Sequence, residues 1–161
     1  MGHRSSPDVA LASTAGMLRA MEPFALTAVE AAAAVRSGQL TPRALVESCI
    51  ARIEEVNPAI NAVVATRFQR ARTEADEAGR RLAAGDPAPL LGVPCTIKEF
   101  VAVAGMPQTS GIDARRGIVA DRDATVVQRL RRAGAIVLGV TNAPEGGLWH
   151  ETSNPVYGRT R

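Results

Sequence analysis

Residues 90–100 read LLGVPCTIKEF, a short apolar run interrupted by Gly and Pro. A second apolar run, AIVLGV, occupies residues 135–140, and a helical pattern that begins near Asp123 leads into it. Apolar runs of this length, bounded by turn residues, are typical of buried strands. Strand, helix and strand in this order form a β-α-β unit, in which both strands run parallel in one sheet. The stretch therefore predicts an α/β fold with its sheet covered on both faces.

The helix between the two runs carries start and stop signals. Asp123 is expected to cap its first turn, and Gly134 is expected to end it. A long loop rich in Gly and Pro fills residues 105–122 ahead of it. The residues expected to face inward are Val126, Val127 and Leu130.

Helices dominate the first half of the chain. Residues 1–21 show neither helical nor strand periodicity and are predicted to be a disordered extension. Residues 22–161 are expected to hold N-terminal helices followed by the first strands of a mixed sheet. The expected elements before residue 90 are a helix from the Thr27/Glu30 capping box to Gly38, a helix from Thr41-Pro42 to Asn57-Pro58, a strand within 60–65, and a helix from Phe68 to Gly85.

Composition excludes several classes of protein. Of the 161 residues, 46% are hydrophobic, 22% are charged and 3% are aromatic, which excludes collagen, a coiled coil and a disordered tail. No run approaches the roughly 20 apolar residues of a membrane span. Cys49 and Cys95 have neither disulfide nor metal-ligand spacing, so we expect a cytoplasmic protein without a metal or cofactor.

Basic and acidic residues number 19 and 16 and are interspersed along the chain. The basic residues at helix ends complement the helix dipoles, and no aromatic residues alternate with them to stack on bases. We therefore expect no binding of nucleic acid. The arginines in question are Arg80, Arg81, Arg131 and Arg132.

Lys98 is the one lysine of the chain, and it closes the strand in residues 90–100. In a parallel sheet it would lie beside Thr141 and Asn142 at the carboxyl edge, where α/β sheets build ligand sites. A poorly hydrated pocket there would disfavour the ammonium form and leave a neutral amine able to act as a base. The same position also suits a lysine that reaches solvent or pairs with Glu99.

Three other side chains have two interpretations each. Cys95 lies near Lys98 and Glu99, as in a Cys-Lys-Glu site, but alternation along the strand directs it to the opposite face from Lys98 and favours a buried structural thiol. Trp149 and Tyr157 either line a substrate channel or pack against parts of the sheet that this chain does not contain, and packing is favoured.

Five segments, in order, resemble the amidase signature family. The first fits the lysine-bearing pattern G-[IV]-P-x2-[IV]-K-[DE]. The segments are 89–99 PLLGVPCTIKE, 103–111 VAGMPQTSG, 123–127 DATVV, 134–145 GAIVLGVTNAPE and 154–160 NPVYGRT. Residues 145–149, EGGLW, are similar to the branch related to fatty-acid amide hydrolases.

The resemblance implies an amidase fold and hydrolysis of a carboxylic amide to an acid and an amine or ammonia. The family uses a serine nucleophile, a second serine in a cis peptide and a lysine base, and Lys98 matches that lysine. A small-molecule amide would be the substrate, and no cofactor is needed. Independently of the resemblance, an unpaired strand edge favours association, so a homo-oligomer is also expected.

The family's Gly-Gly-Ser-Ser-Gly-Gly segment and its nucleophile come after the last matching segment. Residues 22–161 are therefore expected to be the N-terminal part of an amidase domain, truncated before the catalytic serines and inactive alone. Ser110 and Ser153 match neither serine. The alternative is a non-catalytic or truncated module that associates through an exposed sheet edge.

Overall fold

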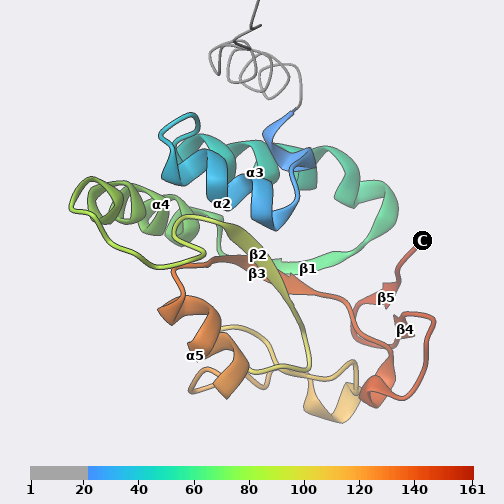
Figure 1. Ribbon diagram of the computed structural model, residues 1–161. Coiled ribbons are helices and arrows are strands. Elements are labelled where there is room, and N and C mark those ends of the chain that lie inside the picture. The colour runs from blue at the N-terminus through green and yellow to red at the C-terminus, as the bar shows by residue number, and fades with distance from the viewer. Residues whose placement is uncertain (1–21) are drawn as a thin grey trace, which may run out of the picture.

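The computed structural model describes residues 22–161 (Figure 1), so the extension expected at 1–21 lies outside the described residues. The helices are α2 Ala28–Arg36, α3 Pro42–Ile60, α4 Phe68–Ala83 and α5 Thr125–Arg132, with single 3₁₀ turns at Pro23–Ala25, Asp113–Arg115 and Glu145–Gly147. The strands are β1 Val63–Thr66, β2 Pro94–Lys98, β3 Ile136–Thr141, β4 Ser153–Asn154 and β5 Gly158–Arg159.

The main sheet has the order β1-β3-β2. Strand β2 runs parallel to β3, which confirms the predicted β-α-β unit, and β1 runs antiparallel to β3, which makes the sheet mixed. Helices α2, α3 and α4 lie over one face, and α5 lies over the other with the long loop after β2 (Figure 1). The predicted α/β class is confirmed.

Apolar side chains fill the space on both faces of this sheet. One cluster joins α3 and α4 to β3, and it contains Val46, Ile50, Ala71, Ala75, Ala78, Leu91, Ile136 and Leu138. The other lies between the sheet, α5 and the long loop, and it contains Ile97, Val103, Met106, Val127, Val137 and Val140. Within residues 22–161, no helix combines the length and apolar character that crossing a bilayer requires.

Polar signals set the first two helix starts as predicted. The Thr27 hydroxyl accepts from the Glu30 amide at 3.3 Å, and a Glu30 carboxylate oxygen accepts from the Thr27 amide at 2.8 Å, which completes the capping box of α2. At α3, the Thr41 hydroxyl accepts from the Ala44 amide at 3.1 Å, with Pro42 as the first helical residue.

The end predicted for α3 at Asn57-Pro58 is wrong. The helix continues through Pro58 to Ile60 and ends at Asn61, whose φ is 53°. A proline in the last turn removes a single amide donor, which the helix tolerates. The Asn57 side chain fixes the residues that follow the helix. Its Oδ1 accepts from the Val63 amide at 2.7 Å and its Nδ2 donates to the Val63 carbonyl at 2.8 Å, which guides the chain into β1.

Two expectations for α5 are also wrong. Asp123 does not cap the helix, because its Oδ1 accepts from the Ala104 amide at 2.8 Å and its Oδ2 pairs with Arg131 at 2.9 Å. Val126 does not face inward, since 52% of its surface is exposed. The helix begins only at Thr125, and Val127 rather than its neighbour points at the sheet.

Three of the four arginines at helix ends form ion pairs with carboxylates of the chain itself. Arg80 pairs with Glu77, and Arg81 pairs with Asp86 at 2.8 Å. Arg131 also contacts Glu74 of α4 at 3.3 Å. Their pairing gives these residues a structural role, and the absence of nucleic-acid binding stays a prediction.

Candidate active site

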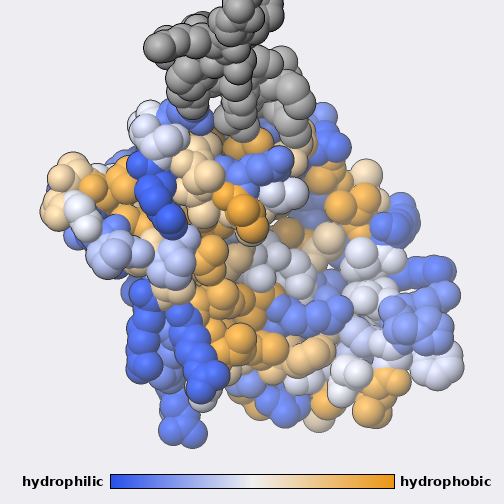
Figure 2. Space-filling view, in the orientation of Figure 1, coloured by the Kyte–Doolittle hydropathy of each residue, from blue (hydrophilic) through white to orange (hydrophobic). Residues whose placement is uncertain are grey.

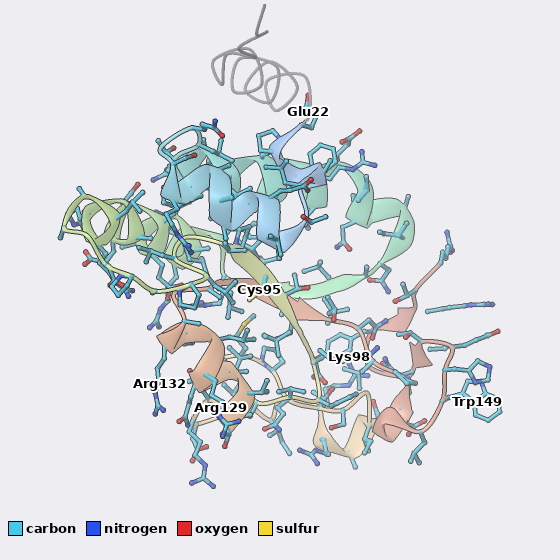
Figure 3. All side chains as sticks on the ribbon, in the orientation of Figure 1. Glu22, Cys95, Lys98, Arg129, Arg132 and Trp149 are labelled. Atoms are coloured by element: carbon cyan, nitrogen blue, oxygen red, sulfur yellow. The ribbon has the colours of Figure 1, made fainter. Side chains whose placement is uncertain are left out.

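Lys98 lies where the sequence predicts it, at the carboxyl end of β2. It pairs in register with Thr141, the last residue of β3. The backbone on either side is fixed, because the Glu99 amide donates to the Thr141 carbonyl at 2.9 Å and the Val101 amide donates to the Lys98 carbonyl at 2.8 Å. In Figure 3 the labelled lysine lies at the end of β2, toward the C-terminal segment.

The side chains of Lys98 and Glu99 have opposite environments. Lys98 is exposed, whereas Glu99 is 0% exposed. Within residues 22–161, Lys98 makes no ion pair, so the alternative in which it pairs with Glu99 is wrong. In this chain the amine reaches solvent, and the poorly hydrated pocket expected around it is not supplied by the described residues.

Glu99 is the centre of a buried hydrogen-bond network. Its Oε1 accepts from the Thr109 amide at 2.6 Å, from the Thr109 hydroxyl at 2.8 Å and from the Tyr157 hydroxyl at 2.8 Å. Its Oε2 accepts from the Ser110 amide at 2.8 Å. One carboxylate therefore joins the end of β2 to the loop at residues 109–111 and to the C-terminal segment.

Two buried asparagines, Asn142 and Asn154, hydrogen-bond to each other in the same region. Asn154 Nδ2 donates to Asn142 Oδ1 and to the Ala143 carbonyl, both at 2.7 Å, and Asn154 Oδ1 accepts from the Tyr157 amide at 2.8 Å. Asn142 Nδ2 donates to the Gly158 carbonyl at 3.1 Å. These bonds hold the segment that carries Tyr157 against the carboxyl end of β3.

Tyr157 is half-buried in this arrangement. Burial raises the pKa of its phenol, and the hydrogen bond that the phenol donates to the Glu99 carboxylate raises it further, against an opposing effect of Thr109. The phenol therefore stays protonated and able to donate at neutral pH. The hydrogen-bond partners of Tyr157 include Glu99 and Asn154 of this chain, which differs from the expected packing against parts that the chain does not contain.

Cys95 does not belong to this network. Burial raises the pKa of its thiol, which opposes formation of the nucleophilic thiolate. Burial also raises the pKa of the Cys49 thiol. Both cysteines are free, and Cys95 packs against the cluster under α5, as expected for a structural thiol.

Leu148 and Trp149 project from the loop after β3. They are 86% and 67% exposed, and the Trp149 ring stacks on His150 with the centroids 4.9 Å apart. Figure 3 shows Trp149 at the outer margin of the C-terminal segment, well away from the labelled Lys98. The two interpretations of Trp149 therefore stay predictions.

Sequence reasoning missed Glu99 as the organising residue. One signal was available: an acid directly after an apolar strand, on the opposite side from Lys98 by alternation, is directed toward the protein interior. The hydrogen-bond partners of Glu99 could not be predicted from the sequence, because Thr109 and Tyr157 are 10 and 58 positions away along the chain.

Comparison with known proteins identifies the family. Residues 44–161 match the Amidase family, and the chain belongs to it. The chain is 44% identical over 143 residues to fatty-acid amide hydrolase 2-A of Danio rerio and 43% identical over 136 residues to an acylamidase of Rhodococcus erythropolis, with 84% of this chain covered in each case. The solved structure of 6-aminohexanoate cyclic dimer hydrolase matches with a TM-score of 0.76 and 38% identity over 88% of this chain.

The same comparisons show how much of each relative this chain covers and which branches of the family match it. The chain spans only 27% and 28% of the lengths of the two relatives and 28% of the solved structure. The predicted family and fold are confirmed. A fatty-acid amide hydrolase and an acylamidase match almost equally well, so the branch stays a prediction.

Proposed function

We propose that this chain is the N-terminal part of an amidase that hydrolyses a small carboxylic amide, with Lys98 as the general base. The observation that carries the proposal is the position of the chain's one lysine, at the carboxyl end of a parallel strand and in register with Thr141, in a member of the Amidase family. Open α/β sheets commonly bind ligands at such an edge.

In the proposed reaction, the neutral amine of Lys98 takes a proton from the cis serine while that serine takes the proton of the nucleophilic serine. The resulting alkoxide attacks the amide carbon, and the C–N bond breaks as the relay returns the proton to the leaving amine. Water then attacks the acyl-enzyme by the same route and releases the acid. The two serines belong to family segments that residues 1–161 do not contain.

The exposure of Lys98 fits this proposal if the remainder of the amidase covers it. A base must lose hydration to stay neutral near pH 7, and this chain spans less than a third of its relatives. We therefore propose that the 161-residue chain alone does not hydrolyse amides, because triad members act as a unit. A cytoplasmic location, inferred from the free cysteines, belongs to the same proposal.

The test uses a polypeptide in which this chain is continued to the length of its relatives. Hydrolysis of a short-chain fatty acid 4-nitroanilide is followed by absorbance. Lys98→Ala should lower kcat by about three orders of magnitude or more, as expected for loss of a relay member. Arg122→Ala, an exposed basic residue in the loop before α5, is the control and should leave kcat unchanged. Full activity in the Lys98→Ala variant would overturn the proposal.

A second candidate function is association of the chain through a sheet edge. Strand β2 has β3 on one side and, in the described sheet, no strand on the other. Beside it lies a groove of about 290 Å³, lined by Phe24, Ile53 and Thr96 among others. Figure 2 shows apolar side chains gathered on the face that carries β2, below α2. A reading frame that continues past Arg161 into a Gly-Gly-Ser-Ser-Gly-Gly segment would favour the enzyme over this candidate.

A further inference from the structure

Lys98 is exposed and forms no ion pair within residues 22–161 that could set the direction of its side chain. Its placement therefore depends on the backbone at the end of β2. That backbone turns sharply, since the Val101 amide closes on the Lys98 carbonyl, and the next side chain, Glu99, is directed into the interior. Contacts that fix the Glu99 side chain therefore also fix the backbone of Lys98, the residue before it.

We propose that Glu99 is a positioning residue for the Lys98 base, fixing the end of β2 through its buried hydrogen bonds to Thr109, Ser110 and Tyr157. The inference rests on the function proposed above. It adds a residue that touches neither substrate nor either serine and that acts only through its neighbour in the chain.

The geometry of the carboxylate supports this role. Four donors from two separate segments converge on its two oxygens at 2.6 to 2.8 Å. A side chain held at both oxygens by backbone amides and hydroxyls has little freedom to rotate. Since Glu99 also donates its own amide to Thr141, the β2 end is held from the strand side and from the loop side.

The loop that supplies the donors is itself fixed. Ser110 has a φ of 56°, a left-handed conformation that a serine adopts at an energetic cost. The next residue, Gly111, lies so close to Asn154 that a Cβ there would be 2.7 Å from the Asn154 Cβ. The strained turn and the close contact keep the Thr109 and Ser110 amides directed at Glu99.

Charge also distinguishes this residue from an ordinary structural acid. Glu99 is fully buried, and none of the ion pairs among residues 22–161 includes it. Burying a carboxylate without a cation is expensive, and an apolar residue could fill the space at a lower cost. In contrast, the partly buried acid Glu74 pairs with the cations Arg67, Arg70 and Arg131.

The experiment uses Glu99→Gln and Tyr157→Phe in the polypeptide continued to the length of its relatives. Glutamine keeps the shape but sets an amide donor against the Ser110 or Thr109 amide. Loss of positioning should lower kcat by about tenfold or more and leave KM within about twofold. Tyr157→Phe removes one of the four bonds and should lower kcat by a smaller factor. Glu74→Gln is the matched control and should leave kcat unchanged.

A double-mutant cycle separates positioning from general stability. If Glu99 acts through Lys98, the Lys98→Ala/Glu99→Gln variant has the kcat of Lys98→Ala alone, because there is no base left to position. Effects that multiply, or an equal loss of kcat in Glu74→Gln, would overturn the positioning role. Should Glu99→Gln not fold, the same cycle with Tyr157→Phe decides, and an unchanged kcat in that variant overturns it.

A spectroscopic reading is independent of activity. In the 161-residue chain Lys98 is the one lysine, so ¹⁵N-lysine labelling of this chain, rather than of the continued polypeptide, gives a single lysine backbone amide signal. The order parameter of this amide should fall below the rigid value of about 0.85 in Glu99→Gln and stay at that value in Glu74→Gln. If Lys98→Ala keeps full activity, the proposed function fails; if Lys98→Ala is inactive while Glu99→Gln keeps its kcat and its rigid signal, only the positioning role fails.

Discussion

At the scale of single residues, the Tyr157 hydroxyl shows how a half-buried group can depend on its neighbour. The phenol donates to the Glu99 carboxylate at 2.8 Å, and its own backbone amide is held by Asn154. Burial and the adjacent carboxylate both disfavour the phenolate, so the pKa of Tyr157 lies above its ordinary value. The hydrogen bond is thus present at neutral pH and vulnerable at alkaline pH.

This direction gives a prediction for stability at high pH. A raised pKa means that the folded state binds the phenol proton more tightly than the unfolded state does, so this stabilisation is complete below about pH 10 and is lost as pH rises through the folded-state pKa. We expect the free energy of unfolding of the unmodified chain to fall more steeply above about pH 10 than that of Tyr157→Phe. Urea unfolding at several pH values measures both, and parallel curves would contradict the expectation.

At the scale of elements, β3 is the strand on which the sheet depends, since it pairs with both β1 and β2. Gly139 of β3 pairs in register with Thr66 of β1. A Cβ at this position would overlap the Ala65 carbonyl oxygen and lie 3.1 Å from the Thr66 Cα. Both neighbours are backbone atoms, which cannot rotate away as a side chain could.

Gly139→Ala is therefore expected to destabilise the fold by about 2 to 3 kcal/mol, through overpacking against backbone. Gly79→Ala is the matched control. Gly79 lies inside α4, and a Cβ added there would meet nothing within 4 Å, so alanine should stabilise the helix by up to about 1 kcal/mol. Chemical denaturation of both variants checks the opposite signs, and equal effects would show that close approach to β1 is not the cause.

The elements also show what sequence patterns can and cannot predict. The starts of α2 and α3 were predictable because a capping side chain acts within three residues of its own position. Asp123 looked like such a cap, but it is taken by the Ala104 amide, 19 positions earlier in the chain. A capping signal in the sequence can therefore be overridden by a hydrogen-bond partner that is distant along the chain and close only in the fold.

At the scale of the whole molecule, local sequence patterns predict the position of Lys98 but not the hydrogen bonds that fix the end of β2. The strand and the parallel pairing were predictable from residues 90–100 and 135–140, and together they define the edge on which Lys98 lies. The buried network around Glu99 was not predictable, because its donors Ser110 and Tyr157 lie far from β2 along the chain. The position of the candidate base could therefore be predicted from the sequence, whereas the hydrogen bonds that fix it could not.

The described fold also leaves β2 with a free edge, and unpaired strand edges associate readily. We expect light scattering to give a mass that rises with concentration above the 16.9 kDa of one chain. Thr96→Lys places a charge on the exposed side of β2 and should return the mass to that of one chain. Thr73→Lys, an exposed position on α4, is the control and should leave association unchanged. A chain of single mass at every concentration, or equal effects of the two lysines, would show that the β2 edge does not drive association.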